Sequence, residues 1–186
     1  MNKPKIHLFV DNSNVLIEGR RLSYAKRFNG GQRNTSVDQT YELDWGKFLH
    51  LVKSRNDRLL SQLPTLYGST PPPDDTVWKE IRDEGFDVKL FERNIRNQEK
   101  GVDLEMGMDI AERTLLVKPP ETIVIVAGDG DFLGAVERAK NRGWNVEVWF
   151  WGNASAKMRD IAEFVNMDQA WEYLKKGGGV ALPPQL

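Results

Sequence analysis

Short apolar runs alternate along the chain with longer segments in which apolar and polar residues are mixed. Two of the runs, residues 6–10 (IHLFV) and 122–126 (TIVIV), are apolar almost throughout. Runs of this length are typical of strands that are buried on both faces of a parallel sheet. Three further strands are predicted between glycine, proline or polar residues, at 64–68, 86–91 and 145–151.

The mixed segments are long enough for helices, and some carry helix end signals. Asp131 precedes one of them and Gly143 follows it, as expected for an N-cap and a C-terminal glycine. In another, Leu104, Met108, Ala111 and Leu115 recur on one face, the pattern of an amphipathic helix. Helices are predicted at residues 15–26, 45–52, 75–84, 103–117, 132–142 and 156–164.

This alternation predicts an α/β fold, a three-layer α/β/α domain with a central, mainly parallel sheet and right-handed crossovers. The length of 186 residues favours one domain with a substantial core. We expect this domain to span residues 1–174 and residues 175–186 (KKGGGVALPPQL) to form a flexible tail. The polar, glycine-rich segment 28–40 and the proline run 71–73 are predicted to be loops.

The composition removes several kinds of chemistry. Cysteine is absent, which excludes disulfides, thiolate zinc sites and cysteine nucleophiles. The two histidines, His7 and His50, are too far apart for a paired-ligand motif and are expected to be structural. No apolar run approaches the roughly 20 residues that span a bilayer, and the first residues do not resemble a signal peptide, so a cytoplasmic location is expected.

Acidic residues follow two of the predicted strands. Asp11 comes directly after the first strand, and Asp129 and Asp131 follow the strand 122–126. Ligands of parallel sheets bind at the carboxyl ends of the strands, near the point where the strand order reverses, so these carboxylates are expected at one edge. Asp103 joins them if the helix that it begins starts over the same edge. Helix capping and turn formation are the alternative roles for these acids.

Clustered carboxylates raise one another's pKa, and a bound cation relieves their repulsion. Oxygen ligands without thiolate or imidazole favour Mg²⁺ or Mn²⁺ over zinc. Such an ion can orient a phosphodiester and activate water, which makes phosphodiester hydrolysis the predicted reaction. Asn14 could hydrogen-bond a ligating carboxylate or a phosphate, or cap a helix. Asp109 falls with Glu105 and Glu112 on a helical stripe for which a solvated face is the simpler explanation.

Affinity for nucleic acid would require local basic clusters, because the net charge is −1. Residues 20–33 contain five cations and no acid, with Tyr24 and Phe28 between them. They could hold a nucleic-acid backbone and stack a base, or form a solvated loop. A second set lies just before Asp103 and could bind phosphates or form ordinary salt bridges. The candidate nucleic-acid-binding residues are Arg20, Arg21, Lys26, Arg27, Arg33, Arg93, Arg96 and Lys100.

Three motifs occur in a recognisable order: Asp11-Asn12-Ser13-Asn14, then Lys100-Gly101-Val102-Asp103 with Asp109 downstream, then Ala127-Gly128-Asp129-Gly130-Asp131-Phe132. Over about residues 5–170 the chain resembles the NYN domain of the PIN-like nucleases, in its LabA-like branch. The resemblance implies a PIN-like, Rossmann-like fold and metal-dependent RNA cleavage. It assigns Asp11, Asp103, Asp129 and Asp131 to the acidic cluster, Asn14 to its polar partner, and Asp109 to a recurrent acid of the family. Two departures are Ala127, where many relatives have serine, and the long segment 28–40.

We weigh three functions. The leading hypothesis is a ribonuclease, a hydrolase that cleaves RNA phosphodiester bonds through Mg²⁺ or Mn²⁺ held by the aspartates. The first alternative is a nucleic-acid-binding or regulatory module that keeps the fold and cleaves nothing. A haloacid-dehalogenase-type phosphatase ranks lowest, because Ser13 stands where that chemistry normally requires a second aspartate. RNA, single-stranded or structured, is the expected partner, no membrane partner is expected, and homo-oligomerisation stays open.

Overall fold

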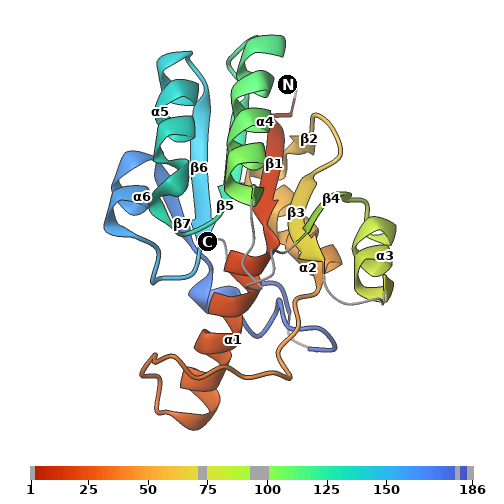
Figure 1. The fold of residues 1–186 in the computed structure, drawn as a ribbon, viewed down its shortest axis with the longest axis vertical. Coiled ribbons are helices and arrows are strands. Elements are labelled where there is room, and N and C mark those ends of the chain that lie inside the picture. The colour runs from red at the N-terminus through yellow and green to blue at the C-terminus, as the bar shows by residue number, and fades with distance from the viewer. Residues whose placement is uncertain (1–2, 71–74, 93–100, 179–180, 184–186) are drawn as a thin grey trace.

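The computed structural model describes residues 3–70, 75–92, 101–178 and 181–183. Its centre is a seven-stranded sheet in the order β4-β3-β1-β5-β6-β7, with β2 beside the start of β1 (Figure 1). Every pairing between these strands is parallel. The strands are β1 (Lys5–Asp11), β2 (Leu59–Leu60), β3 (Thr65–Thr70), β4 (Asp87–Glu92), β5 (Thr122–Val126), β6 (Asn145–Phe150) and β7 (Glu163–Asn166).

Helices cover both faces of the sheet. The α-helices are α1 (Asn12–Phe28), α2 (Trp45–Ser54), α3 (Thr76–Asp83), α4 (Val102–Leu116), α5 (Leu133–Asn141) and α6 (Ala156–Ile161). Short 3₁₀ turns occur at η1 (Arg55–Asp57), η2 (Gly130–Phe132) and η3 (Met167–Ala170). Among the described residues, no helix combines the length and apolar character needed to cross a bilayer.

Two apolar clusters, one on each face of the sheet, join the sheet to the helices of the two outer layers. Alternate residues of β1 point to opposite faces, so Ile6, Leu8 and Val10 join one cluster while Phe9 joins the other. The first cluster packs against α1, α2 and α3, and the second packs against α4, α5 and α6. The predicted three-layer α/β/α fold with a mainly parallel sheet is therefore confirmed.

The strand order reverses beside β1. From β1 the chain builds outward to β3 and β4, and it then returns to the other side of β1 to add β5, β6 and β7. The switch point between β1 and β5 is where open parallel sheets bind ligands at their carboxyl ends. Asp11 ends β1 and Asp129 follows β5, so both acids lie at this point.

The buried face of α4 differs from the one that the apolar pattern suggests. Leu104, Met108 and Leu115 are exposed, at 69%, 58% and 69% of their surface. The buried residues of α4 are instead Val102, Met106, Ile110 and Thr114. The helix therefore has two apolar stripes, and the second one contacts the sheet.

One predicted boundary near the C-terminal end needs correction. The predicted helix 156–164 ends at Ile161, because Ala162 is extended and residues Glu163–Asn166 pair with β6 as β7. The start of the expected tail packs on the domain: Lys175 forms an antiparallel bridge with Leu43. Backbone contacts with the domain therefore extend at least one residue beyond residue 174.

Candidate metal centre

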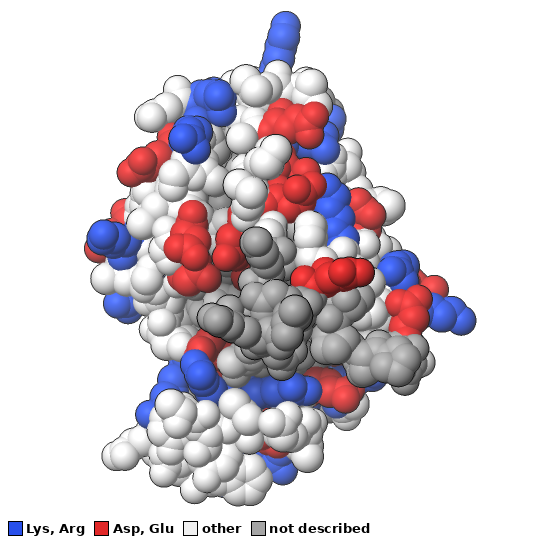
Figure 2. Space-filling view, viewed as in Figure 1, with Lys and Arg blue, Asp and Glu red and all other residues white. Residues whose placement is uncertain are grey.

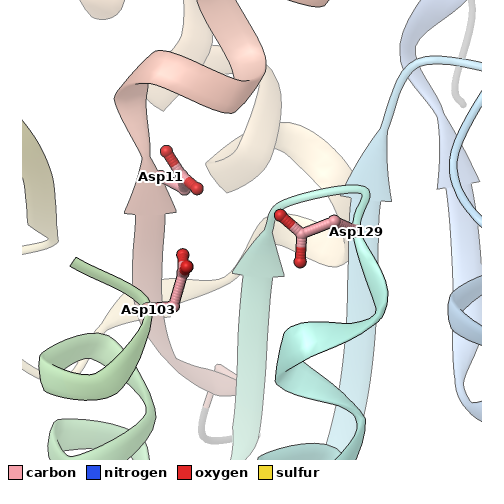
Figure 3. Close-up of side chains that lie close together, drawn as sticks. All are labelled: Asp11, Asp103 and Asp129. Atoms are coloured by element: carbon pink, nitrogen blue, oxygen red, sulfur yellow. The ribbon is translucent and has the colours of Figure 1, made fainter. Parts of the chain in front are cut away.

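Three carboxylates converge at the carboxyl edge of the sheet. Asp11, Asp103 and Asp129 each offer an oxygen atom, and these oxygens lie within 4.8 Å of one another (Figure 3). The acids come from the end of β1, the first turn of α4 and the loop after β5. Residues far apart in sequence thus meet at the switch point of the sheet.

Asp11 is held by the start of α1. It is buried, at 4% exposure, and forms the N-cap of the helix, with its Oδ1 accepting a hydrogen bond of 3.0 Å from the Asn14 backbone N–H. A capping aspartate satisfies one of the unpaired N–H groups of the first helical turn. The carboxylate is therefore fixed in orientation before any ligand binds.

The Asn14 side chain connects Asp11 to the loop that carries Asp129. Its Oδ1 accepts a hydrogen bond of 2.9 Å from the buried backbone N–H of Gly128. The carbonyl of Gly128 in turn accepts a bond of 2.8 Å from the backbone N–H of Ser155. A Cβ at position 128 would lie 2.1 Å from the ring of Phe150, so only glycine fits here. Both peptide groups of this turn are thereby anchored.

The environment of Asp129 disfavours its charge. Burial raises the pKa of Asp129, and the negative charge of Asp131 raises it further, against the opposing effect of a hydrogen bond from the Asp131 backbone N–H. A hard cation would reverse this balance, since it favours the ionised carboxylate. The site thus resembles a cation site in its electrostatics as well as its geometry.

The donor set fits Mg²⁺ or Mn²⁺. All the atoms are carboxylate oxygens, the ligands that such hard ions prefer. Oxygens bound to one Mg²⁺ at about 2.1 Å lie up to about 4.2 Å apart, which is close to the 4.8 Å within which these three oxygens lie. Asp103 is exposed, which leaves one side of the site open to solvent.

Two sequence-predicted acids lie outside this group. Asp131 is exposed, and its contact with Asp129 is through the 3.0 Å backbone hydrogen bond of the η2 turn. Asp109 lies further along α4, where it accepts hydrogen bonds from the Tyr67 hydroxyl and, at 2.6 Å, from Lys89 Nζ. Burial, followed by this contact with Asp109, raises the pKa of Tyr67. Asp109 therefore has cationic and hydroxyl partners of its own.

The basic residues 20–33 contact the rest of the protein. Arg20 donates from Nε to the Tyr41 carbonyl at 3.1 Å, and Arg21 pairs with Glu18. The other three cations contact Trp171, Asp38 and Asp168, in the pairs Lys26–Trp171, Arg27–Asp38 and Arg33–Asp168. These contacts position α1 and the segment after it, so the predicted loop 28–40 also holds α1 against the rest of the domain. Arg93, Arg96 and Lys100 lie outside the described residues.

Sequence reasoning missed two supporting features of this edge. The first is the close approach of Gly128 to Phe150, which the Gly-Asp-Gly-Asp pattern alone does not distinguish from an ordinary turn. The second is the contact of Tyr67 and Lys89 with Asp109. Tyr67 and Lys89 are register partners on β3 and β4, so the parallel pairing would have indicated that they share a face.

Comparisons with known proteins bear on the family and the fold of the chain. The profile of the NYN domain matches residues 5–168. A crystal structure of a protein of unknown function, VPA0982 from Vibrio parahaemolyticus RIMD 2210633, superimposes with a TM-score of 0.62 at 22% identity, over 89% of this chain and 93% of that chain. At this identity the likeness shows the fold alone. Comparison with curated proteins finds no match.

Proposed function

The chain belongs to the NYN domain family, and from this premise we propose that it is a metal-dependent ribonuclease. The observation that carries the proposal is the convergence of Asp11, Asp103 and Asp129 at the switch point of the sheet. Family membership supports a nuclease over a haloacid-dehalogenase-type phosphatase. The proposed cofactor is Mg²⁺ or Mn²⁺, and the proposed reaction is hydrolysis of an RNA phosphodiester bond.

A bound Mg²⁺ or Mn²⁺ would supply Lewis-acid stabilisation of the phosphate and a lowered pKa for an attacking water. The chain itself supplies the orientation. Asp11 is fixed as a helix cap, and Asn14 sets the distance between Asp11 and the loop of Asp129. Asp103 provides charge on the open side, where the phosphodiester would approach. Asp131 contributes a nearby negative charge and, through its backbone N–H, orients Asp129.

Cleavage assays with matched variants test the proposal. Labelled single-stranded and structured RNAs are incubated with Mg²⁺, Mn²⁺ or EDTA. Asp11→Asn and Asp129→Asn are compared with Asp160→Asn, an exposed aspartate outside the three-acid group. We expect metal-dependent cleavage by wild type and Asp160→Asn, and a loss of at least about a hundredfold in the two site variants. Replacing a ligating carboxylate removes charge at nearly constant volume, so thermal unfolding should show an intact fold.

The same experiment separates the alternatives. RNA binding without cleavage under any metal condition would favour the non-catalytic module. Cleavage that survives both site substitutions would remove Asp11 and Asp129 from the mechanism. Asp131→Asn and Asp109→Asn are added to measure the contribution of the two predicted acids that lie outside the group.

A further inference from the structure

The outer face of α1 leads away from the three acids and carries exposed aromatic and apolar side chains between cations. We infer that this face holds single-stranded RNA, with bases stacked on Tyr24 and Phe28. The inference deepens the proposed function, since it places the flanking part of the substrate whose scissile bond would lie at the acidic site. It rests on that function only for the cleavage step.

The face is defined by helical spacing. Ile17, Tyr24 and Phe28 are separated by seven and four residues, so they project from one side of α1. Ile17 is 44% exposed and Phe28 is 60% exposed. The rings of Tyr24 and Phe28 lie with their centroids 5.5 Å apart and their planes inclined by 44°. A half-exposed aromatic pair of this kind offers a surface on which a base can stack.

The same stretch is the basic part of an otherwise acidic chain. Residues 12–40 contain five cations and two acids, a net charge of +3, whereas the chain as a whole carries −1. Figure 2 shows a band of basic side chains below the acidic side chains in the middle of the view, with a mostly uncharged surface beneath that band. The guanidinium of Arg27 also lies 5.0 Å from the centre of the Phe28 ring. Cations interleaved with aromatic rings are the usual composition of single-strand binding surfaces.

The length of α1 sets the size of the footprint. Its 17 residues begin directly after Asp11, so Phe28 lies about 25 Å along the helix axis from the acids at a rise of about 1.5 Å per residue. A stacked strand advances about 3.4 Å per nucleotide, which corresponds to about seven nucleotides. A strand that stays stacked and is much shorter than this does not reach from the acids to the aromatic pair.

The surface is held in place before RNA binds. Ser23 and Arg27 both donate to Asp38 Oδ2, at 2.7 and 2.6 Å, and the Asp38 backbone N–H donates to the Arg20 carbonyl at 3.0 Å. The helix therefore keeps its outer face turned to solvent. Base stacking also selects against duplex RNA, whose paired bases already cover each other's faces.

Binding measurements in EDTA test the inference separately from catalysis. Unstructured RNAs of about 4, 8 and 12 nucleotides and a duplex of about 12 base pairs are titrated into wild type, Phe28→Ala, Phe28→Trp and a Tyr24→Ala/Phe28→Ala variant. Leu116→Ala, which removes an equally exposed apolar side chain at the far end of α4, is the control. Thermal unfolding checks that each variant is folded.

We expect wild type to bind the 8- and 12-nucleotide strands more tightly than the 4-nucleotide strand, and Phe28→Ala to weaken the longer strands roughly tenfold. Phe28→Trp should keep the affinity, and Leu116→Ala should match wild type. Unchanged binding of long strands by the double variant, or an equal loss for the duplex, would overturn the inference. If the double variant loses long-strand binding and wild type never cleaves RNA, the inference is supported and the proposed reaction is refuted. If wild type cleaves RNA and Tyr24→Ala/Phe28→Ala cleaves it equally well at limiting RNA, the proposed reaction is supported and the inference is refuted.

Discussion

The Asn14 side chain links the start of α1 to the loop that carries Asp129, so its removal makes a sharp test. Asn14→Ala deletes the acceptor of the Gly128 N–H, which lies 2.9 Å from Oδ1. The substitution leaves the Asn14 backbone N–H, and hence the helix cap by Asp11, in place. The expected effect is therefore confined to the loop that carries Asp129.

The magnitude follows from the burial of the two partners. Gly128 is buried, so its N–H loses a hydrogen bond that solvent replaces poorly, at a cost of about 1–3 kcal/mol. Asn14 is half-buried, which allows water to enter and places the expected loss near the lower end of that range, at about 1 kcal/mol. Loss of a group that orients metal ligands typically weakens metal affinity by about 10- to 100-fold. Metal affinity should therefore suffer more than stability.

Two measurements separate these effects. Urea unfolding gives the free energy of unfolding, and calorimetric titration with Mn²⁺ gives metal affinity. Asn153→Ala is the matched control, because its exposed amide bonds to Glu18 and to none of the three acids in the contacts described. An Asn14→Ala variant that binds Mn²⁺ within twofold of wild type would refute the view that Asn14 positions the site.

Three further predictions concern the same region. Gly128→Ala should lower the free energy of unfolding by about 2 kcal/mol and weaken Mn²⁺ binding, because its Cβ would meet the buried Phe150 ring. The control is Gly107→Ala on α4, which has open space around it and should be neutral or stabilising by about 1 kcal/mol in urea unfolding. Asp129→Asn should stabilise the metal-free protein near pH 7 but not below about pH 3. Burial raises the pKa of Asp129 in the folded state, so the wild-type protein loses stability as the pH rises and this carboxyl group ionises. A difference in urea midpoint between variant and wild type that is the same at both pH values would contradict this. At Asp38, hydrogen bonds from Thr40, Ser23 and Arg27 outweigh burial and hold the pKa well below its usual value, so this stabilisation is present above about pH 4 and lost in acid. Asp38→Asn should accordingly cost about 2 kcal/mol at pH 7 and much less in acid, as measured by urea unfolding at each pH.

Much of the fold can be predicted from the sequence because its central strands are buried on both faces. The runs at the centre of β1 and β5 are apolar almost throughout, and their short length favours strands over helices. The strand β7 was missed because its four residues follow a helix without a glycine or proline to mark the change. On α4 the sequence contains two apolar stripes, and periodicity cannot decide which one faces the sheet.

The site was partly predictable for a similar reason. Strand ends predict where Asp11 and Asp129 lie, since a parallel sheet brings its carboxyl ends to one edge. The position of Asp131 depends on the 3₁₀ turn Gly130–Phe132, which sequence spacing does not specify. The partners of Asp109 depend on the pairing of β3 with β4, because Lys89 and Tyr67 reach it from neighbouring strands. A local sequence pattern does not specify which residues of two separate strands pair with each other.

Because Asp11 lies at the base of α1, a small rotation of this helix about its N-cap moves the far end of α1 by a larger distance. A rotation of about 5° at this cap would displace the far end of a helix about 25 Å long by about 2 Å. The segment after α1 braces that end, because Arg33 pairs with Asp168 at 2.6 Å and Asp168 also accepts the Gly152 N–H at 2.9 Å. Substitution of Arg33 or Asp168 should therefore shift the far end of α1 relative to the acidic site at its base.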